Sequence, residues 1–180
     1  MGFHFWYQEL EKEAFIRLGC EKDEKPWLSV DVYPGMGFKT AGLCYKGEWL
    51  QPYHPEWSPL LQKETFGNTV LFPTPNRVRN GVFTFQGRRV EMRRNGILQT
   101  QHGLAQNGSW RVTNLSKADE EVFITAEFCI CPGDENYQAF PYASRLTVTY
   151  VLTACGLTCR YGVQNLGNDS MPFGFGLHPW

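Results

Sequence analysis

The sequence has no long hydrophobic run and no excess of charge of either sign. No stretch reaches the roughly 18 apolar residues of a membrane span. The first residues, MGFHFWYQELEKEAFIRLG, lack the basic region, apolar region and cleavage site of a secretory signal. Lys and Arg number 17 against 18 Asp and Glu, a formal net charge of -1. We therefore predict a soluble, cytoplasmic protein that binds neither membranes nor nucleic acid.

The cysteines lack the spacing of a metal site. Cys129 and Cys131 are separated by one residue, and Cys155 and Cys159 by three, whereas zinc sites commonly use C-x2-C pairs. In a reducing compartment thiols stay free. We expect no metal, no other cofactor, and no disulfide among the six cysteines, Cys20, Cys44, Cys129, Cys131, Cys155 and Cys159.

Helices long enough to connect parallel strands are also missing. Short alternating runs rich in Val, Ile, Thr, Tyr and Phe are separated by Gly, Pro, Asn and Asp, which is typical of strands. These runs are WLSVDVYP, GLCYKGEWL, GVFTFQGRRVEM, EVFITAEFCI, RLTVTYVLT and LTCRYGVQNL. Hairpins are predicted at Gln86-Gly87 and at Ala154-Cys155-Gly156. Only EAFIRL, after QELEK, suggests a helix.

This pattern predicts an all-β fold, an antiparallel β-sandwich. No linker, repeat or low-complexity tract divides the chain, so residues 1–180 are expected to form one domain. An open sheet face bearing some of the 27 aromatic residues would suit a sugar, although most of the 13 Phe, 8 Tyr and 6 Trp are expected in the core.

Two segments break the strand pattern. GNTVLFPTPNRVRNG reads as an irregular loop, and such loops commonly carry functional groups. Within it, the forked donors of Arg77, beside Asn76, suit two adjacent hydroxyls or a carboxylate, whereas Arg79 is expected to face solvent. QTQHGLAQNGSW places His102 before a glycine. A second histidine, His178, lies in FGFGLHPW.

Taken in order, four segments resemble the aldose 1-epimerase (galactose mutarotase-like) family. They are FGNTVLFPTPNRVRNGVFTFQGRRVEM, QHGLAQNGSWRV, FPYASRLTVTYVL and QNLGNDSMPFGFGLHPW, and the resemblance extends from about Val30 to Trp180. Each short motif alone is a weak signal, but their order and the Pro-Phe-Gly-x-Gly-x-His-Pro pattern are specific. The resemblance implies a large antiparallel β-sandwich of the supersandwich type, whose concave face interconverts the α and β anomers of a hexose without a cofactor.

The resemblance also implies roles for individual residues. His178 would be the acid that protonates the ring oxygen, a role that suits an imidazole because it titrates near neutral pH. His102 would hydrogen-bond near the ring oxygen and share in stabilising charge. Arg77, with Asn76, would orient the sugar hydroxyls. We expect the side-chain tips of Arg77, His102 and His178 to converge on one concave face.

The family's general base, a glutamate, and a sugar-binding aspartate lie downstream of the motif that contains His178, and the family's domain is longer than this chain. We therefore expect either a sandwich truncated at its C-terminus or one that a partner completes, and a homo-oligomer is compatible with this. If the base lies within the chain, Glu127 and Asp134 are the first candidates.

Three alternatives remain open from the sequence. One is a non-catalytic carbohydrate-binding or regulatory member of the fold, and another is a sandwich that only shares the motifs. The third is a hexose-6-phosphate mutarotase, for which Arg88-Arg89 and Arg93-Arg94 would supply the positive charges. Because successive side chains of a strand point to opposite faces, at most one arginine of each pair can face a cleft. His4 and His54, in FHFWY and PYHPEW, are expected to pack or to cap turns.

Overall fold

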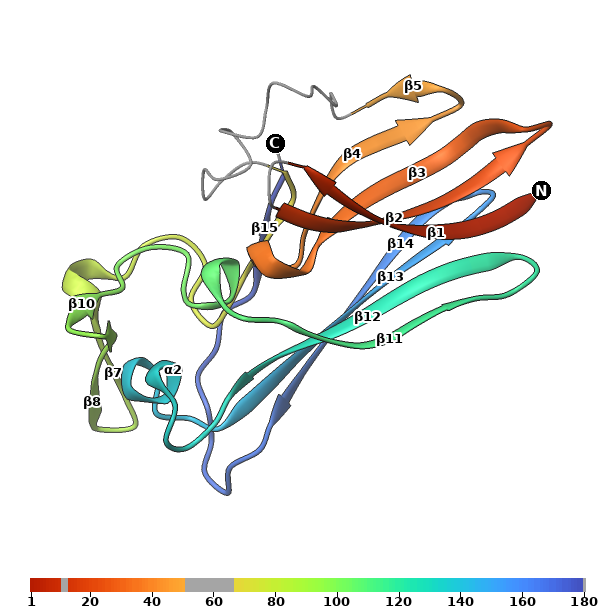
Figure 1. The fold of residues 1–180 in the computed structure, drawn as a ribbon. Coiled ribbons are helices and arrows are strands. Elements are labelled where there is room, and N and C mark those ends of the chain that lie inside the picture. Colours follow the sequence, from red (N-terminus) through yellow and green to blue (C-terminus); the bar gives the residue numbers. More distant parts are fainter. Residues whose placement is uncertain (11–12, 51–66, 180) are drawn as a thin grey trace.

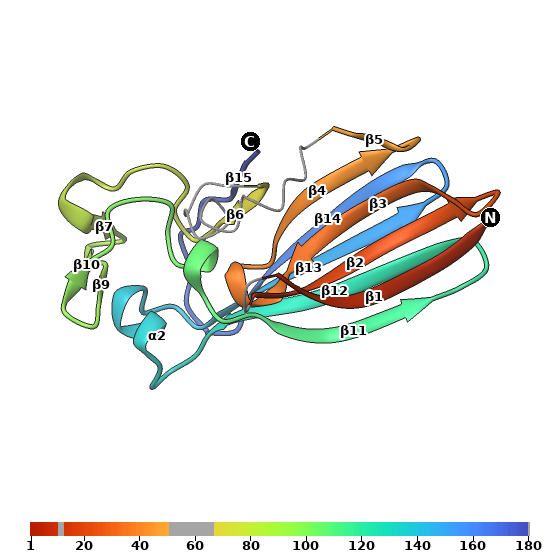
Figure 2. The ribbon, with the colours of Figure 1, turned by 45° about the horizontal axis from the view of Figure 1, so that its top comes forward.

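Antiparallel strands make up most of the described chain. The structure, a computed structural model, describes residues 1–10, 13–50 and 67–179. The first sheet has the order β1-β2-β3-β4-β5, with β1 at Gly2–Leu10, β2 at Glu13–Lys22, β3 at Lys25–Tyr33, β4 at Lys39–Tyr45 and β5 at Glu48–Trp49. The second has the order β11-β12-β13-β14, with bounds Arg111–Lys117, Glu121–Ile130, Ser144–Thr153 and Gly156–Asn165. These two sheets lie face to face (Figures 1 and 2).

The space between the two sheets is filled by one hydrophobic core. On β12, Val122, Ile124, Ala126, Phe128 and Ile130 are buried while the residues between them are partly exposed, which is the period of two of a strand with one packed face. β2 and β3 contribute the opposing side chains to the same core. The predicted antiparallel β-sandwich is therefore confirmed.

Hydrogen bonds between polar groups also join the two sheets. The Trp27 indole N–H donates to the carbonyl of Ala154 at 3.0 Å, and the Tyr150 hydroxyl donates to the carbonyl of Phe38 at 3.1 Å. Burial raises the pKa of Tyr150 well above its usual value, so this hydroxyl stays a neutral donor. Phe38 stacks between the rings of Tyr150 and Trp110, with centroids 5.1 and 5.4 Å away.

A smaller group of elements projects from one end of the sandwich (Figure 1). It comprises the hairpin of β7 (Val82–Phe85) and β8 (Arg88–Glu91), the pair β9 (Arg93–Arg94) and β10 (Ile97–Leu98), and helix α2 (Glu135–Ala139). A separate pair joins β6 (Thr69–Leu71) to β15 (Gly176–His178). None of the described helices is long and apolar enough to cross a membrane.

Most strand predictions are confirmed, and two details are wrong. EAFIRL is part of β2 rather than a helix. β2 lies between β1 and β3, and its alternate residues Ile16 and Leu18 enter the core while Phe15 is buried on the opposite face. Burial on both faces removes the simple alternation that marks a strand. In the second hairpin Thr153 pairs with Gly156, so Ala154 and Cys155 form the turn and Gly156 begins β14.

The outer face of the first sheet holds a buried ion pair. Arg17 donates from Nε to Oδ1 of Asp31 at 2.6 Å and from Nη2 to Oδ2 at 2.8 Å. The Asp31 side chain is fully buried, and that of Arg17 is 21% exposed. Burial raises the pKa of the Asp31 carboxyl, and the hydrogen bonds and charge of Arg17 oppose the rise.

Replacing Arg17 by methionine is expected to lower the free energy of unfolding by about 3 kcal/mol near neutral pH, because a buried carboxylate loses its partner. Without the guanidinium, the pKa of folded Asp31 rises further above its unfolded value. The neutral acid tolerates burial, so the loss should shrink as pH falls toward about 4. Urea denaturation across this pH range measures the effect.

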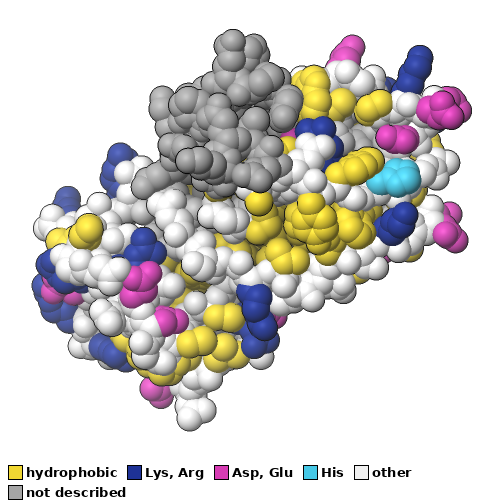
Figure 3. Space-filling model, in the orientation of Figure 1, with side chains coloured by type: hydrophobic (Ala, Val, Ile, Leu, Met, Phe, Trp, Pro, Cys, Tyr) yellow, Lys and Arg dark blue, Asp and Glu magenta, His cyan; other side chains and the backbone are white. Residues whose placement is uncertain are grey.

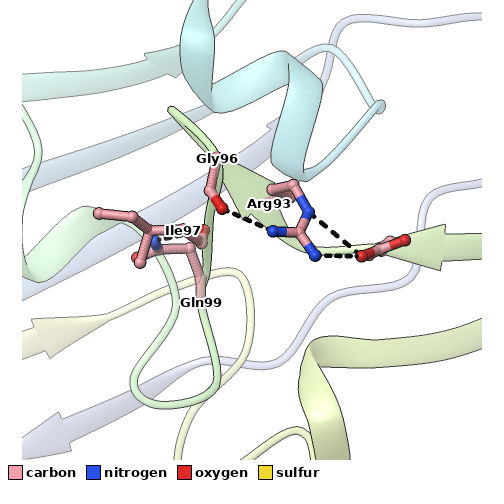
Figure 4. A network of polar contacts seen from close by, with 5 residues as sticks. Arg93, Gly96, Ile97 and Gln99 are labelled. Atoms are coloured by element: carbon pink, nitrogen blue, oxygen red, sulfur yellow. Dashed lines mark hydrogen bonds and ion pairs between the residues drawn. The ribbon is translucent and has the colours of Figure 1, made fainter.

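The matched control is Arg93→Met. Arg93 donates to Oε1 of Glu91 at 2.8 Å from Nη2 and to the carbonyl of Gly96 at 2.5 Å, in the network of Figure 4. Both side chains of this ion pair are nearly half exposed, so the loss should stay below about 1 kcal/mol. Equal losses in the two variants, or a loss for Arg17→Met that does not vary with pH, would contradict the assignment.

Candidate functional site

His178 is held in place by a short strand pair. β15 pairs antiparallel with β6, and His178 lies opposite Thr69. Beyond β6 the chain passes through a cis peptide bond between Phe72 and Pro73, and the amide of Gly174 donates to the carbonyl of Pro73 at 2.6 Å. The FGFG segment is thus fixed against the loop that begins at β6.

His102 is fixed against the same loop. Its backbone has a φ of 62°, in the left-handed region, and its amide donates to the carbonyl of Asn76 at 2.8 Å. The next two amides after Gly103, those of Leu104 and Ala105, both donate to the carbonyl of Phe72, at 2.8 and 3.0 Å. Backbone hydrogen bonds therefore attach both the FGFG segment and the His102 segment to the loop after β6.

These backbone contacts bring the two histidines together. The ring centroids of His102 and His178 are 5.2 Å apart, and their planes meet at 78°. His102 is 6% exposed and His178 is partly exposed. The pair therefore combines a buried imidazole with one that solvent or a ligand can reach.

Gln101 contacts the buried ring directly. Its amide nitrogen Nε2 donates to Nε2 of His102 at 2.9 Å. This contact fixes the orientation of the buried imidazole ring. Sequence reasoning did not single out Gln101, and its position directly before His102 is the only signal that could have found it.

Arg77 and Asn76 lie on the chain segment beside His102. Arg77 forms an antiparallel bridge with Gln101, and the amide of Val78 donates to the carbonyl of Thr100 at 2.9 Å. Both Arg77 and Asn76 are exposed, and Asn76 has a φ of 59°. The backbone thus places Arg77 next to the histidine pair. Convergence of its guanidinium on the same ligand remains a prediction.

Gly103 is required by its surroundings. Its φ is 73°, and a Cβ at this position would lie 2.4 Å from the carbonyl oxygen of Phe72. That oxygen accepts two hydrogen bonds and cannot move freely. The glycine of the His-Gly dipeptide therefore lets the His102 segment approach the loop after β6.

We expect Gly103→Ala to lower the free energy of unfolding by about 1–2 kcal/mol from the left-handed backbone alone, and further through the clash. Thermal or urea denaturation measures this. Gly87→Ala is the matched control, because Gly87 also has a positive φ of 77° but its Cβ would meet nothing within 4 Å. If both variants lose the same stability, the contact with Phe72 is not what requires glycine.

The two carboxylates considered as in-chain bases are held elsewhere. Glu127 accepts from Arg111 at 2.9 Å and pairs with Arg145 at 3.7 Å. Asp134 caps α2, accepting from the amides of Tyr137 at 2.6 Å and Cys131 at 2.7 Å. Both carboxylates therefore have structural partners in the second sheet and its connection.

The remaining residues singled out from the sequence are exposed, have structural contacts or lie outside the described residues. Arg79 is exposed, as expected. Arg88 and Arg89 are both exposed, and the Arg88 guanidinium lies 5.4 Å from the Tyr142 ring centroid. His4 packs on Trp6 with ring centroids 5.5 Å apart, and His54 lies outside the described residues. Within residues 1–10, 13–50 and 67–179 no cluster of metal-ligating side chains is found.

Comparison with known proteins decides the family. The family model of aldose 1-epimerase matches residues 46–180. The chain belongs to the aldose 1-epimerase family. The match includes Arg77, His102 and His178, and it covers the whole second sheet but only β5 of the first.

The individual relatives match most of this chain, but the matched region is only part of each relative's own length. The uncharacterized protein YihR of Escherichia coli K12 is 31% identical over 81% of this chain and 44% of its own. A galactose mutarotase-like protein from Clostridium acetobutylicum superposes with a TM-score of 0.77 at 19% identity, over 97% of this chain and 53% of that one. Galactose 1-epimerase from Lactobacillus acidophilus gives a TM-score of 0.59 at 18% identity, over 85% and 45%. The chain thus spans about half the length of these proteins.

Proposed function

We propose that this chain carries the acid part of an aldose 1-epimerase site and that it acts on a hexose as an isomerase. The observation that supports the proposal most is the pairing of His102 with His178, whose rings are 5.2 Å apart although the residues are distant in sequence. Membership of the family supports the reaction class. We further infer that residues 1–180 form one structural unit of a cytoplasmic protein.

In the proposed reaction a base removes the proton of the anomeric hydroxyl while His178 protonates the ring oxygen. The bond between C1 and the ring oxygen breaks, and the sugar becomes an open-chain aldehyde. Rotation about the C1–C2 bond presents the other face of the carbonyl, and the reverse transfers close the ring as the other anomer. The acid is regenerated, and no cofactor takes part.

The two histidines would have different duties because their surroundings differ. His178 is the more exposed ring and is able to meet the sugar, so we assign it the acid role. His102 is buried and oriented by Gln101, which suits a fixed hydrogen-bonding group near the ring oxygen. Arg77, with Asn76, would orient the sugar hydroxyls through its forked donors.

A non-catalytic carbohydrate-binding role is the second candidate. It is favoured by the structural partners of Glu127 and Asp134, because a chain without a catalytic base would bind a sugar and turn it over little. A hexose-6-phosphate specificity has less support. Arg93 is bound to Glu91 and Gly96, and Arg88 lies over Tyr142.

Polarimetry of freshly dissolved α-D-glucose or α-D-galactose tests the proposal, with the rate in buffer subtracted. A rate above buffer, alone or with an added carboxylate, that depends on His178 supports the isomerase. Sugar binding with no such rate under either condition supports the second candidate.

A further inference from the structure

A cleft on the outer face of the first sheet lies apart from the histidine pair. It has a volume of about 440 Å³. Trp6 of β1 and Trp49 of β5 form its sides, and Gly19, Ser29 and Cys44 of the strands between them form its floor. We call these five residues the tryptophan trough. Figure 3 shows hydrophobic side chains gathered over this face of the β1–β5 sheet.

Small floor residues shape the trough. Gly19 belongs to β2, and a Cβ there would lie 2.8 Å from Cζ3 of the Trp6 indole. The indole therefore lies directly on the backbone of the neighbouring strand and occupies the position that any other side chain would fill. His4 packs beside the same ring. The ring is thus held in a defined orientation before any ligand arrives.

Polar groups at the margin of the trough are also held in place. The Arg17 guanidinium is fixed by its two hydrogen bonds to the buried Asp31 and lies 5.6 Å from the Trp49 ring centroid. Gln8 and Glu21 also line the cleft. The rim therefore places a guanidinium of fixed orientation, an amide and a carboxylate around two indole rings.

Two indoles over a floor of small residues, with polar groups at the rim, have the chemistry of a carbohydrate site. The C–H faces of a pyranose pack on aromatic rings while its hydroxyls need donors and acceptors at the edge. The volume lies within the roughly 300–1,000 Å³ of small-molecule sites and suits a mono- or disaccharide. We propose that the tryptophan trough is a second, non-catalytic sugar-binding site, separate from the histidine pair.

Saturation-transfer NMR and calorimetric titration with methyl β-D-galactopyranoside, methyl α-D-glucopyranoside and lactose test the proposal. The methyl glycosides cannot open their rings, so turnover elsewhere does not consume them. We expect weak binding of at least one probe, which Trp49→Ala lowers about tenfold. Gly19→Ala should weaken it too, because the new methyl group displaces the Trp6 ring without removing it.

Tyr7→Ala is the matched control. Tyr7 adjoins Trp6 on β1 but points to the opposite face and is 72% exposed, so its loss should leave binding unchanged. Gln8→Ala changes an exposed side chain at the rim and should weaken binding about threefold, so the test does not depend on changes to the walls and floor of the trough alone.

Arg77→Ala distinguishes the two sites, because it should weaken sugar binding at the histidine pair, while trough binding should persist in it whether or not the proposed isomerase activity exists. The proposal is overturned if no probe binds. It is equally overturned if binding in folded Trp49→Ala and Gly19→Ala matches the wild type, or if binding disappears with Arg77→Ala alone.

Discussion

The 180-residue chain is expected to accelerate mutarotation little by itself and much more once formate is added. A chain that supplies the acid without the base falls about 10²- to 10⁴-fold short of an enzyme with both. Glu127 and Asp134 are bound to structural partners, and the resemblance implies a glutamate base downstream of His178. We expect formate, a small carboxylate, to enter the site and accept the proton of the anomeric hydroxyl. We expect at least a tenfold gain, which is less than the roughly 10²- to 10⁴-fold contribution of a positioned general base because free formate is not held in place.

The measurement is polarimetry of α-D-galactose with the protein at rising formate concentrations. Parallel runs without protein remove the catalysis by formate itself. Glu127→Gln and Asp134→Asn serve as further variants, and neither should alter the formate-dependent rate of the folded protein. If the chain without formate already matches an enzyme with both groups, and one of these two variants removes that rate, the base lies within the chain and the assignment is wrong.

Three strands of the second sheet, β12, β13 and β14, could be predicted closely from the sequence because alternate residues pack on one face, whereas β11, which is mostly exposed, was not predicted. EVFITAEFCI coincides with β12, and its alternation is visible in the letters alone. The first sheet was harder to predict from the sequence. Its residues are buried on both faces, as Phe15 and Leu18 of β2 show, and β1 was not predicted at all. Helix α2 was also missed, because its five residues are too few to set up a helical period.

The candidate site was predicted by family resemblance rather than by local pattern. The ordered motifs selected His102 and His178, and the structure places their rings together through backbone bonds between Phe72, Asn76 and the His102 segment. No periodicity encodes such contacts between loops. Gln101 and the trough formed by Trp6 and Trp49 carried no motif, and only the register of the strands brings the trough residues together.

Replacing His178 by alanine is expected to remove the formate-dependent rate almost entirely, by about 10²- to 10⁴-fold, because the ring oxygen then has no proton donor when the C1 bond breaks. His178→Asn should behave alike, since an amide donates a hydrogen bond but does not transfer a proton at neutral pH. Binding of a methyl hexoside at the histidine pair should change much less than the rate.

The companion variants separate acid chemistry from positioning. Imidazole added to His178→Ala should restore part of the rate, since it can occupy the vacated space and donate the proton, whereas it should not help Arg77→Ala. Arg77→Ala should mainly weaken binding, and Arg77→Lys should recover little because the ammonium lacks the forked donors. His102→Ala should lower the rate as well, through loss of the fixed group beside the ring oxygen. A His178→Ala protein that folds and keeps the full formate-dependent rate would transfer the acid role to another residue, with His102, 5.2 Å from His178 between ring centroids, the next to test.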